Sequence, residues 1–464
     1  MVPTFPRSLS SSLFFRALLA LGFARATAGC SARSALLDEG GGGSVAETSV
    51  TGTGGAGGAR PLACGTTLPV SSPITLDTAG GTPDQPAFAF GSNDGSVLSV
   101  FHVWSPTDGG PAEIHVSTLE PWAAWPPPAG AAWTVPAAEG RSFRVANVSY
   151  GNVEMLVHGL DPAPNEDLLI TEPMSATSPG EYLGIPVASE SESPTPIALV
   201  RGYDSPPIAL NWGYLAMLVT WESVDAPSGQ HALHMAVSES GVDIIAGTVT
   251  RPDEPPLACA TGIIHADGIR SGKSWLVATS TGAPLRACGD GPSTIASTLA
   301  IDRITWGAPD SVDWTLERAD AQNGDALIES VHLAPVHDGG WALVGRKGHA
   351  VPDLVRVDAK GKLSDPIAAT PPDAGSVREA SIVGLGSGIL VAYVDEAQPR
   401  RVRLEARDRE GIVGATGAVE AAGDVSELTL LGSKDGSSVA VGYRSTVDGN
   451  ATIELARVGC EVSQ

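Results

Sequence analysis

The chain has 464 residues, of which 52 are acidic and 28 are Lys or Arg, and its formal net charge is −24. This charge argues against nucleic acid as a partner, because binding to phosphates depends on clustered basic side chains. The 55 glycines and 36 prolines favour short strands joined by turns over long helices.

Residues 1–29 have the composition of a secretion signal. Arg7 and Arg16 supply positive charge, residues 17–24 form a short apolar core, and residues 26–28 are small, as signal peptidases require. Neither this core nor any later segment has the roughly 20 apolar residues that a membrane-spanning helix needs. Removing residues 1–29 removes three arginines and no acidic residue, so the exported chain has a formal charge of −27.

The end of the signal allows two kinds of processing. Residues 27–30, Thr-Ala-Gly-Cys, resemble the lipobox of bacterial lipoproteins, and this resemblance implies that Cys30 is acylated. Ser31 after the cysteine is similar to the outer-membrane sorting pattern. Cleavage after Ala28 without acylation, giving an extracellular protein, is the alternative.

The chain has five cysteines, and an odd number in an exported protein requires an explanation. Acylation of Cys30 leaves an even four, namely Cys64, Cys259, Cys288 and Cys460. Residues 30–60 are rich in Gly, Ser, Thr and Ala, which predicts a flexible tether that holds a folded domain away from a membrane.

Short apolar runs, each preceded by a glycine, recur along residues 61–464. Successive glycines are 48 to 68 residues apart, about the length of one four-stranded unit. The runs are 96–101, 152–157, 214–219, 273–278, 341–344, 389–393 and 437–443. The repeat predicts an all-β fold, a seven-bladed β-propeller of four-stranded antiparallel blades. Tandem β-sandwiches are the alternative.

The sixth unit shows the expected blade most clearly. Its strands are predicted at 377–384, 389–394, 401–407 and 412–419. In the third strand, apolar residues alternate with charged ones that include Glu405 and Arg407, which predicts one solvent-exposed face. The segments 122–133 and 301–323 are predicted to be long connections.

The last unit ends before its fourth strand. We therefore expect residues 65–76 to supply that strand and to close the ring, which also removes an exposed sheet edge. In this arrangement Cys64 lies beside Cys460, and Cys259 lies near Cys288. The blade geometry thus selects these two disulfides from three possible pairings.

The turn motifs and the histidines carry little functional information. Residues 91–96 and 432–437 match each other and predict hairpin turns, because Asp-Gly favours tight turns. His231 and His234 are three apart in a predicted strand and therefore face opposite sides. A channel site built from His102, His158 and His265 is the alternative to isolated histidines, and we expect no metal site.

The remaining sequence offers one candidate ligand platform and no motif for catalysis. Trp122, Trp125 and Trp133 accompany three consecutive prolines, and such rigid rings can stack on sugars or peptides; covering the edge of the first blade is the alternative. Residues 320–325 are predicted to be a turn. Phosphate-binding loops, nucleophile elbows and zinc motifs are absent from the sequence, so we expect no cofactor.

The signal, Cys30, the tether and the sevenfold pattern together resemble secreted bacterial lipoproteins of the β-propeller type. This resemblance implies a cell-surface or periplasmic protein whose propeller binds or scaffolds a protein or carbohydrate ligand. We expect a monomer that contacts the membrane only through its lipid anchor and that is not an enzyme. A polysaccharide hydrolase or lyase on the same scaffold is the alternative.

Overall fold

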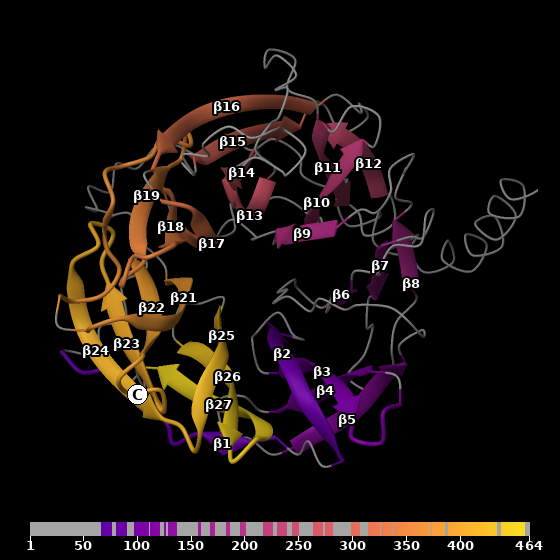
Figure 1. The fold of residues 1–464 in the computed structure, drawn as a ribbon, viewed down its shortest axis with the longest axis vertical. Coiled ribbons are helices and arrows are strands. Elements are labelled where there is room, and N and C mark those ends of the chain that lie inside the picture. Colours follow the sequence, from indigo (N-terminus) through magenta and orange to yellow (C-terminus); the bar gives the residue numbers. More distant parts are fainter. Residues whose placement is uncertain are drawn as a thin grey trace, which may run out of the picture. The chain divides into compact units, whose positions relative to one another are not determined.

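The computed structural model of the chain is all-β in the residues that it describes (Figure 1). The chain divides into two compact units, Met1–Ala56 and Gly57–Gln464, and all the described residues belong to the second. They are residues 66–76, 80–90, 97–110, 112–120, 125–126, 129–136, 156–158, 168–171, 182–185, 195–200, 217–225, 230–238, 244–249, 263–271, 274–281, 298–306, 314–324, 326–336, 338–372, 374–385, 388–433 and 438–459.

Several sequence predictions lie outside these residues. They are the signal, the acylation of Cys30, the tether and both disulfides, since all five cysteines lie elsewhere in the chain. Within the described ranges, no helix is long and apolar enough to cross a membrane.

The described strands form six four-stranded antiparallel sheets and one three-stranded sheet. The first sheet contains β2 (Gly81–Phe90), β3 (Leu98–Pro106), β4 (Glu113–Leu119) and β5 (Ala129–Pro136). The second contains β6 (Leu156–His158), β7 (Leu168–Thr171) and β8 (Tyr182–Ile185). The third contains β9 (Thr195–Val200), β10 (Met217–Asp225), β11 (Gln230–Ser238) and β12 (Ile244–Val249). The fourth contains β13 (Ile263–Ser271), β14 (Ser274–Thr281), β15 (Thr298–Trp306) and β16 (Trp314–Asn323).

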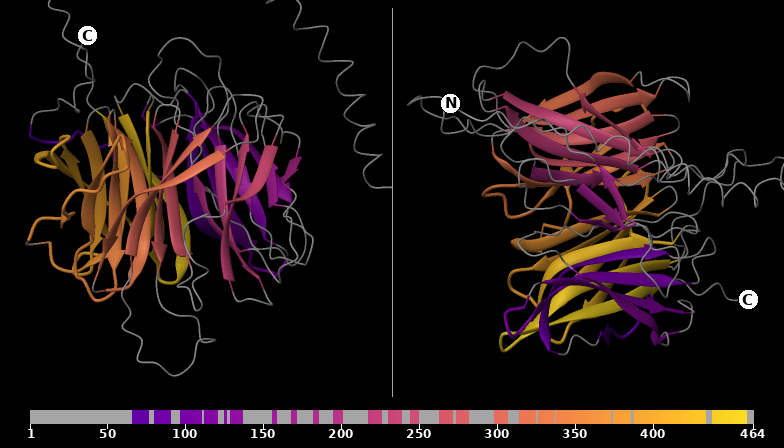
Figure 2. Two further views of the ribbon diagram at one scale, coloured as in Figure 1. Left: turned by 90° about the horizontal axis from the view of Figure 1, so that it is seen from above. Right: turned by 90° about the vertical axis from the view of Figure 1, so that its right-hand side faces the viewer.

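The remaining sheets come from the C-terminal third of the chain, apart from one N-terminal strand. The fifth sheet contains β17 (Ile328–Val336), β18 (Gly339–Arg346), β19 (Asp353–Asp358) and β20 (Ile367–Ala368). The sixth contains β21 (Val377–Leu385), β22 (Gly388–Asp395), β23 (Arg401–Arg407) and β24 (Val413–Glu420). The last contains β25 (Asp424–Gly432), β26 (Ser438–Val447), β27 (Asn450–Gly459) and β1 (Ile74–Thr75). Figure 2 shows the twist of these sheets from two further sides.

The glycine-led runs mark the second strand of every four-stranded sheet. Six of the seven predicted runs overlap these strands, β3, β10, β14, β18, β22 and β26, and those at 341–344 and 389–393 lie wholly within them. The run at 152–157 overlaps only the start of β6, the first described strand of the three-stranded sheet. From the third sheet onward, neighbouring sheets pack through their first strands, and β25 contacts β2 of the first sheet. Neighbouring blades of a β-propeller pack in the same way.

The prediction that residues 301–323 form a connection is wrong. Most of the segment lies in β15 and β16, which are paired strands of the fourth sheet. Charged residues interrupt the apolar pattern, but they pair across the strands: Arg318 contacts the Asp302 carboxylate at 2.6 Å, and Arg303 contacts Glu317 at 2.7 Å. Asp320 also lies in β16 rather than in a turn, and it accepts a hydrogen bond from the Leu363 N–H of the fifth sheet.

Turns with one shared design join the third and fourth strands of the fifth and sixth sheets. In each turn an aspartate Oδ1, of Asp358 or Asp408, accepts the backbone N–H groups two and four residues later. The intervening Gly361 and Gly411 have φ of +87° and +82°, which glycine adopts without strain. A Cβ on Gly411 would lie 2.6 Å from Ile367, so the turn of the sixth sheet packs closely on the fifth.

Residues 66–76 form an N-terminal strap that runs along two sheets. Its first part pairs with β24, since the Leu68 N–H donates to the Thr416 carbonyl at 2.8 Å. Its second part contains β1 and pairs with β27, where the Leu76 N–H donates to the Ile453 carbonyl at 2.9 Å. The predicted segment 65–76 therefore contributes the fourth strand of the last sheet.

The strap also contacts the first sheet. The indole N–H of Trp125 donates to the Ser72 carbonyl at 2.9 Å. Leu76 packs in one core cluster with Phe88 of β2 and Leu455 of β27. The strap thus takes part in the core between the first and last sheets.

We predict that Leu76→Ala lowers the free energy of unfolding by about 2 to 3 kcal/mol, because it leaves a cavity in that core. Thr75→Ala is the control, since Thr75 is exposed and precedes Leu76 directly, and we expect a change within about 0.5 kcal/mol. Urea denaturation measures both values. Equal, negligible effects would show that the strap is peripheral to the fold.

Candidate functional site

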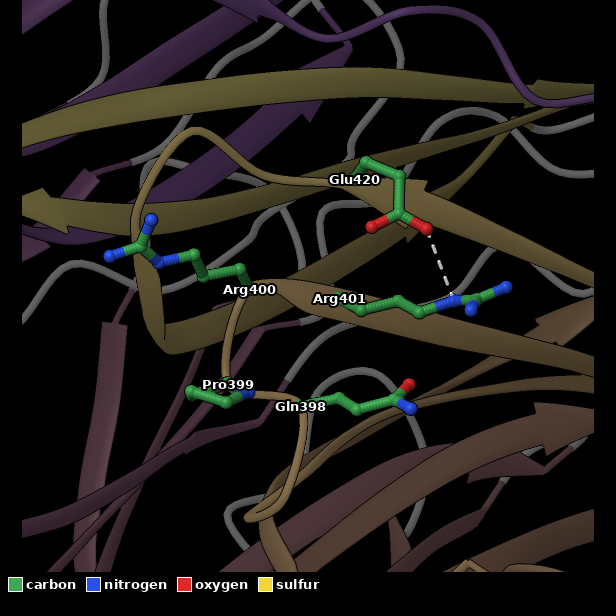
Figure 3. Close-up of a pocket in the computed structure, with 5 residues that line it drawn as sticks. All are labelled: Gln398, Pro399, Arg400, Arg401 and Glu420. Carbon is green, nitrogen blue, oxygen red and sulfur yellow. Dashed lines mark ion pairs between the residues drawn. The ribbon is translucent and has the colours of Figure 1, made fainter.

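A pocket of about 350 Å³ lies at the turn between β22 and β23 (Figure 3). Its lining comes from this turn, from the start of β23 and from the end of β24. The lining residues are Gln398, Pro399, Arg400, Arg401 and Glu420. Two arginines in a chain with a net charge of −24 make this pocket chemically distinctive.

Backbone hydrogen bonds hold the pocket turn in place. The turn is closed by Asp395, whose carbonyl accepts the Gln398 N–H at 3.0 Å. The Pro399 carbonyl accepts the Val425 N–H at 2.8 Å, and the Arg400 carbonyl accepts the Ala421 N–H at 2.8 Å. Because these bonds reach the connection between β24 and β25, the turn is fixed to two sheets at once.

The arginines of the pocket are paired but exposed. Arg401 Nε lies 3.2 Å from Glu420, and Arg400 Nε lies 3.3 Å from Asp424. The Arg401 side chain is 45% exposed and that of Glu420 is 70% exposed. Exposed pairs of this kind stabilise a fold by at most about 1 kcal/mol, so an incoming anion can compete for the guanidinium.

Gln398 and Arg401 present donors to the same side. Their side chains extend in one direction in Figure 3, whereas that of Arg400 extends the opposite way. Gln398 Oε1 accepts a hydrogen bond from Arg403 at 3.3 Å, which leaves the Gln398 amide NH₂ as a donor. A planar guanidinium beside an amide donor suits carboxylate, sulfate or phosphate oxygens.

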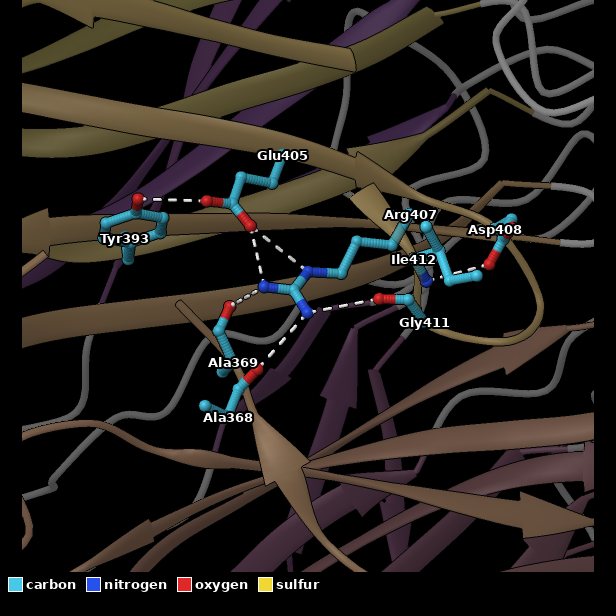
Figure 4. A network of polar contacts seen from close by, with 8 residues as sticks. All are labelled: Ala368, Ala369, Tyr393, Glu405, Arg407, Asp408, Gly411 and Ile412. Carbon is cyan, nitrogen blue, oxygen red and sulfur yellow. Dashed lines mark hydrogen bonds and ion pairs between the residues drawn. The ribbon is translucent and has the colours of Figure 1, made fainter. Parts of the chain in front are cut away.

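A buried polar network anchors the same strand, β23 (Figure 4). Glu405 accepts the Tyr393 hydroxyl at 3.1 Å and pairs with Arg407 at 2.7 Å. Arg407 also donates to the carbonyls of Ala369 and Gly411, at 2.7 and 3.3 Å. Because Ala369 follows β20, the network joins the fifth and sixth sheets.

The prediction of a solvent-exposed face for this strand is therefore wrong for Glu405 and Arg407. Glu405 is only 4% exposed and Arg407 only 6% exposed. Buried charges are tolerated when they are paired and their remaining hydrogen-bonding groups are satisfied, as they are here. Burial, reinforced by the Glu405 carboxylate, raises the pKa of Tyr393 to about 12, so Tyr393 donates to this carboxylate at neutral pH.

The last sheet contains a related pair. The Tyr443 hydroxyl donates to Glu454 at 3.0 Å, and burial followed by this carboxylate raises the pKa of Tyr443. Glu454 also accepts the Ala422 N–H, at 3.3 Å to either oxygen. Ala422 follows β24 as Ala369 follows β20, so each network reaches the chain that leaves the preceding sheet, through Glu454 in the last sheet and through Arg407, the partner of Glu405, in the sixth.

The predicted tryptophan platform is only partly described. Trp122 lies outside the described residues. Trp125 is half-buried and bonds to the strap, as noted above, and Trp133 lies in β5 rather than in a loop. The platform stays a prediction.

Of the histidines of the hypothetical channel site, one lies in the second strand of its sheet and two lie in the first described strand of theirs. His102 is in β3, His158 in β6 and His265 in β13. The described residues contain no group of three or more His, Cys, Asp or Glu side chains arranged to hold a metal ion.

Sequence reasoning missed the pocket, although a signal was present. Arg400, Arg401 and Arg403 form a local basic cluster at the start of the correctly predicted strand 401–407. The register that places Arg401 opposite Glu420 can be counted from the hairpin between β23 and β24. The donor role of Gln398 depends on its bond to Arg403, which no sequence pattern indicates.

Comparisons give structural similarity only. No protein-family model matches the chain, and neither does any curated protein. An oligogalacturonate lyase in complex with manganese is similar with a TM-score of 0.47 and 11% identity, over 85% of this chain and 99% of the lyase. The hemagglutinin-neuraminidase of parainfluenza virus 5 has a TM-score of 0.43 and 9% identity, over 87% of this chain and 97% of the viral chain. An α-L-arabinofuranosidase from Fusarium graminearum has a TM-score of 0.38 and 12% identity, over 85% and 99%.

At these scores and identities the three proteins assign no activity to this chain.

We predict that Glu405→Gln lowers the free energy of unfolding by about 3 kcal/mol, because Arg407 then keeps a buried charge without its anion. Glu420→Gln is the matched control in the same sheet. It removes an exposed pair and should change stability by no more than about 1 kcal/mol. Urea denaturation measures the free energy of unfolding of both variants. Equal losses of stability would contradict the anchoring role of the network.

Proposed function

We propose that this chain is an exported, lipid-anchored β-propeller that binds an anionic ligand at the pocket beside Arg401. One observation carries the proposal, namely the exposed guanidinium of Arg401 next to the amide donor of Gln398 on a rigid turn. Bidentate recognition by arginine is typical of sites for carboxylates and sulfates. An acidic polysaccharide is the ligand class that fits a cell-surface protein with this site.

Several contacts support a closed ring of seven blades for this propeller. β2 of the first sheet contacts β25, β26 and β27 of the last sheet, and β1 adds the fourth strand to that sheet. The Phe88 ring of β2 occupies the space above Gly442 of β26, where a Cβ would overlap it. The predicted bridge from Cys64 to Cys460 would fasten the same junction.

The alternative is a hydrolase or lyase acting at the same pocket. Glu420 favours it, because this carboxylate lies beside the anion-binding guanidinium, where a catalytic base would be needed. A glycoside hydrolase requires a second carboxylate at roughly 5 to 10 Å. Among the lining residues given above, Glu420 is the single carboxylate, and binding without turnover is therefore the main proposal.

We expect polygalacturonate, used as a carboxylated probe, to bind the wild-type protein, and neutral dextran not to bind. Arg401→Ala should weaken polygalacturonate binding by roughly tenfold, the value of one charge-assisted contact. Arg303→Ala is the control, because Arg303 is also an ion-paired, partly exposed arginine on another sheet. Isothermal titration calorimetry measures the affinities. No binding of the acidic polymer, or equal binding by Arg401→Ala, contradicts the proposal.

The same samples test the alternative. Catalysis would release reducing ends or form unsaturated uronates from the polymer. If the wild-type protein does so and Glu420→Gln does not, the function is catalysis and not binding alone.

The ring is tested by a double-mutant cycle between Phe88 and Gly442. We expect Gly442→Ala to destabilise the wild-type protein by about 2 kcal/mol or more, because the new methyl group meets the Phe88 ring. In the Phe88→Ala background the same change should cost much less, because the ring is gone. Additive effects in urea denaturation would contradict packing of the first sheet on the last.

A further inference from the structure

His102 is a buried side chain without a hydrogen-bond partner. It lies in β3, is 1% exposed, and neither of its ring nitrogens has a partner. Its ring contacts that of His115 in β4 edge to face, with 5.5 Å between the ring centres. The two residues are directly opposite each other in the sheet register.

The second histidine is tied to two further side chains. His115 Nε2 lies 3.0 Å from the Glu113 carboxylate, and the Trp104 ring stacks on His115 at 4.6 Å. Trp104 and Glu113 also face each other across β3 and β4. The four side chains therefore share one face of the first sheet.

This face packs against the last sheet. Val100, two residues before His102 on the same face, belongs to one core cluster with Ala440 and Leu455 of the last sheet. Arg444 of β26 donates to the Pro83 carbonyl at 2.9 Å and so bridges the two sheets. We call this contact between the first and last sheets the seam.

The charged groups that face the seam are known from the register. Arg444 follows Gly442 by two residues in β26, and Arg457 follows Leu455 by two residues in β27, so both arginines lie on the face toward the first sheet. Glu113 is the acidic group on the histidine face, and β1 contributes no charged residue. In β25, Asp424 lies opposite Thr446 and so on the same face as Arg444. Glu113 is engaged by His115 and Asp424 by Arg400, and neither ring nitrogen of His102 has a hydrogen-bond partner.

Protonation of His102 is therefore unfavourable while the seam is closed. Burial, followed by the charge of His115, lowers the pKa of His102 from 6.5 to about 4. When the seam opens, water reaches the ring and the pKa returns toward its ordinary value. The open form then binds more protons between these two values, so the closed form loses stability as the pH falls through this window.

We propose that the seam is an acid-sensitive switch in which His102 is the proton acceptor, and that acid loosens the N-terminal strap. The strap shares the core of the seam through Leu76 and is bonded to the first sheet through Trp125. Opening of the seam removes both contacts. The regions of the sixth sheet away from the strap keep their own packing and stay closed.

Hydrogen exchange of the full chain, followed by mass spectrometry between about pH 7 and pH 4, tests this switch. After correction for the intrinsic pH dependence of exchange, opening of strap residues 66–76 should increase on the order of a hundredfold relative to β23. His102→Leu should abolish this increase, because it removes the buried imidazole that has no hydrogen-bond partner, whereas His115 keeps its contact with Glu113. His349→Gln, an exposed histidine in the fifth sheet, should behave as the wild type.

If His102→Leu does not fold, His102→Gln replaces it, since glutamine is polar but does not titrate. An equal increase in the strap for wild type and either non-titrating variant overturns the proposal. Equal increases in the strap and in β23 also overturn it, because they indicate global acid unfolding.

Discussion

The backbone hydrogen bonds between the N-terminal strap and β27 are the constraint on which the rest of the structure depends. Through them, a segment near the start of the folded unit becomes the fourth strand of its last sheet. The strap also covers part of the edge of β24, and Trp125 ties it to the first sheet. The eleven residues of the strap thereby contact the sixth and last sheets, which are consecutive in sequence, and the first sheet, which is far from them in sequence. Covered edges also limit pairing with other chains.

Buried polar contacts between neighbouring sheets act alongside this constraint. Glu405 with Arg407, and Glu454, bind backbone groups of the segment that leaves the preceding sheet. Such bonds set the position of one sheet against the next more specifically than apolar contact does, since a half-satisfied charge in the core is costly. β23 shows the functional consequence. Its buried end is fixed by the Glu405 network, and its exposed end presents Arg401 in the pocket.

The seam differs from these polar contacts in the hydrogen bonding of its buried polar groups. Where the buried Glu405–Arg407 pair of the sixth sheet is satisfied, the first sheet leaves both ring nitrogens of His102 without partners. An unpaired buried polar group has an energetic cost that depends on its protonation. The proposed acid sensitivity of the seam follows from this difference.

Much of the architecture could be predicted from the sequence, because it depends on local patterns. The glycine-led apolar runs mark second strands, which are buried on both faces, and β23 begins and ends at the predicted residues. Residues 301–323 were mispredicted because their strands are stabilised by ion pairs across the sheet rather than by apolar alternation.

The candidate site was harder to predict than the fold. Gln398 and Glu420 are distant in sequence and meet only through the register of a hairpin and the path of a turn. The burial of Glu405 depends on carbonyl groups in another sheet, and the pairing of His102 with His115 depends on the register of β3 and β4. Such information is carried by tertiary contacts and not by composition or spacing.

Non-reducing peptide mapping of the exported protein tests the central claim most directly. The Gly459 N–H donates to the Pro69 carbonyl at 3.2 Å, so the last residue of β27 lies beside the first half of the strap. The account predicts a disulfide-linked peptide pair that contains Cys64 and Cys460. Linkage of Cys64 to Cys259 or Cys288 would contradict it.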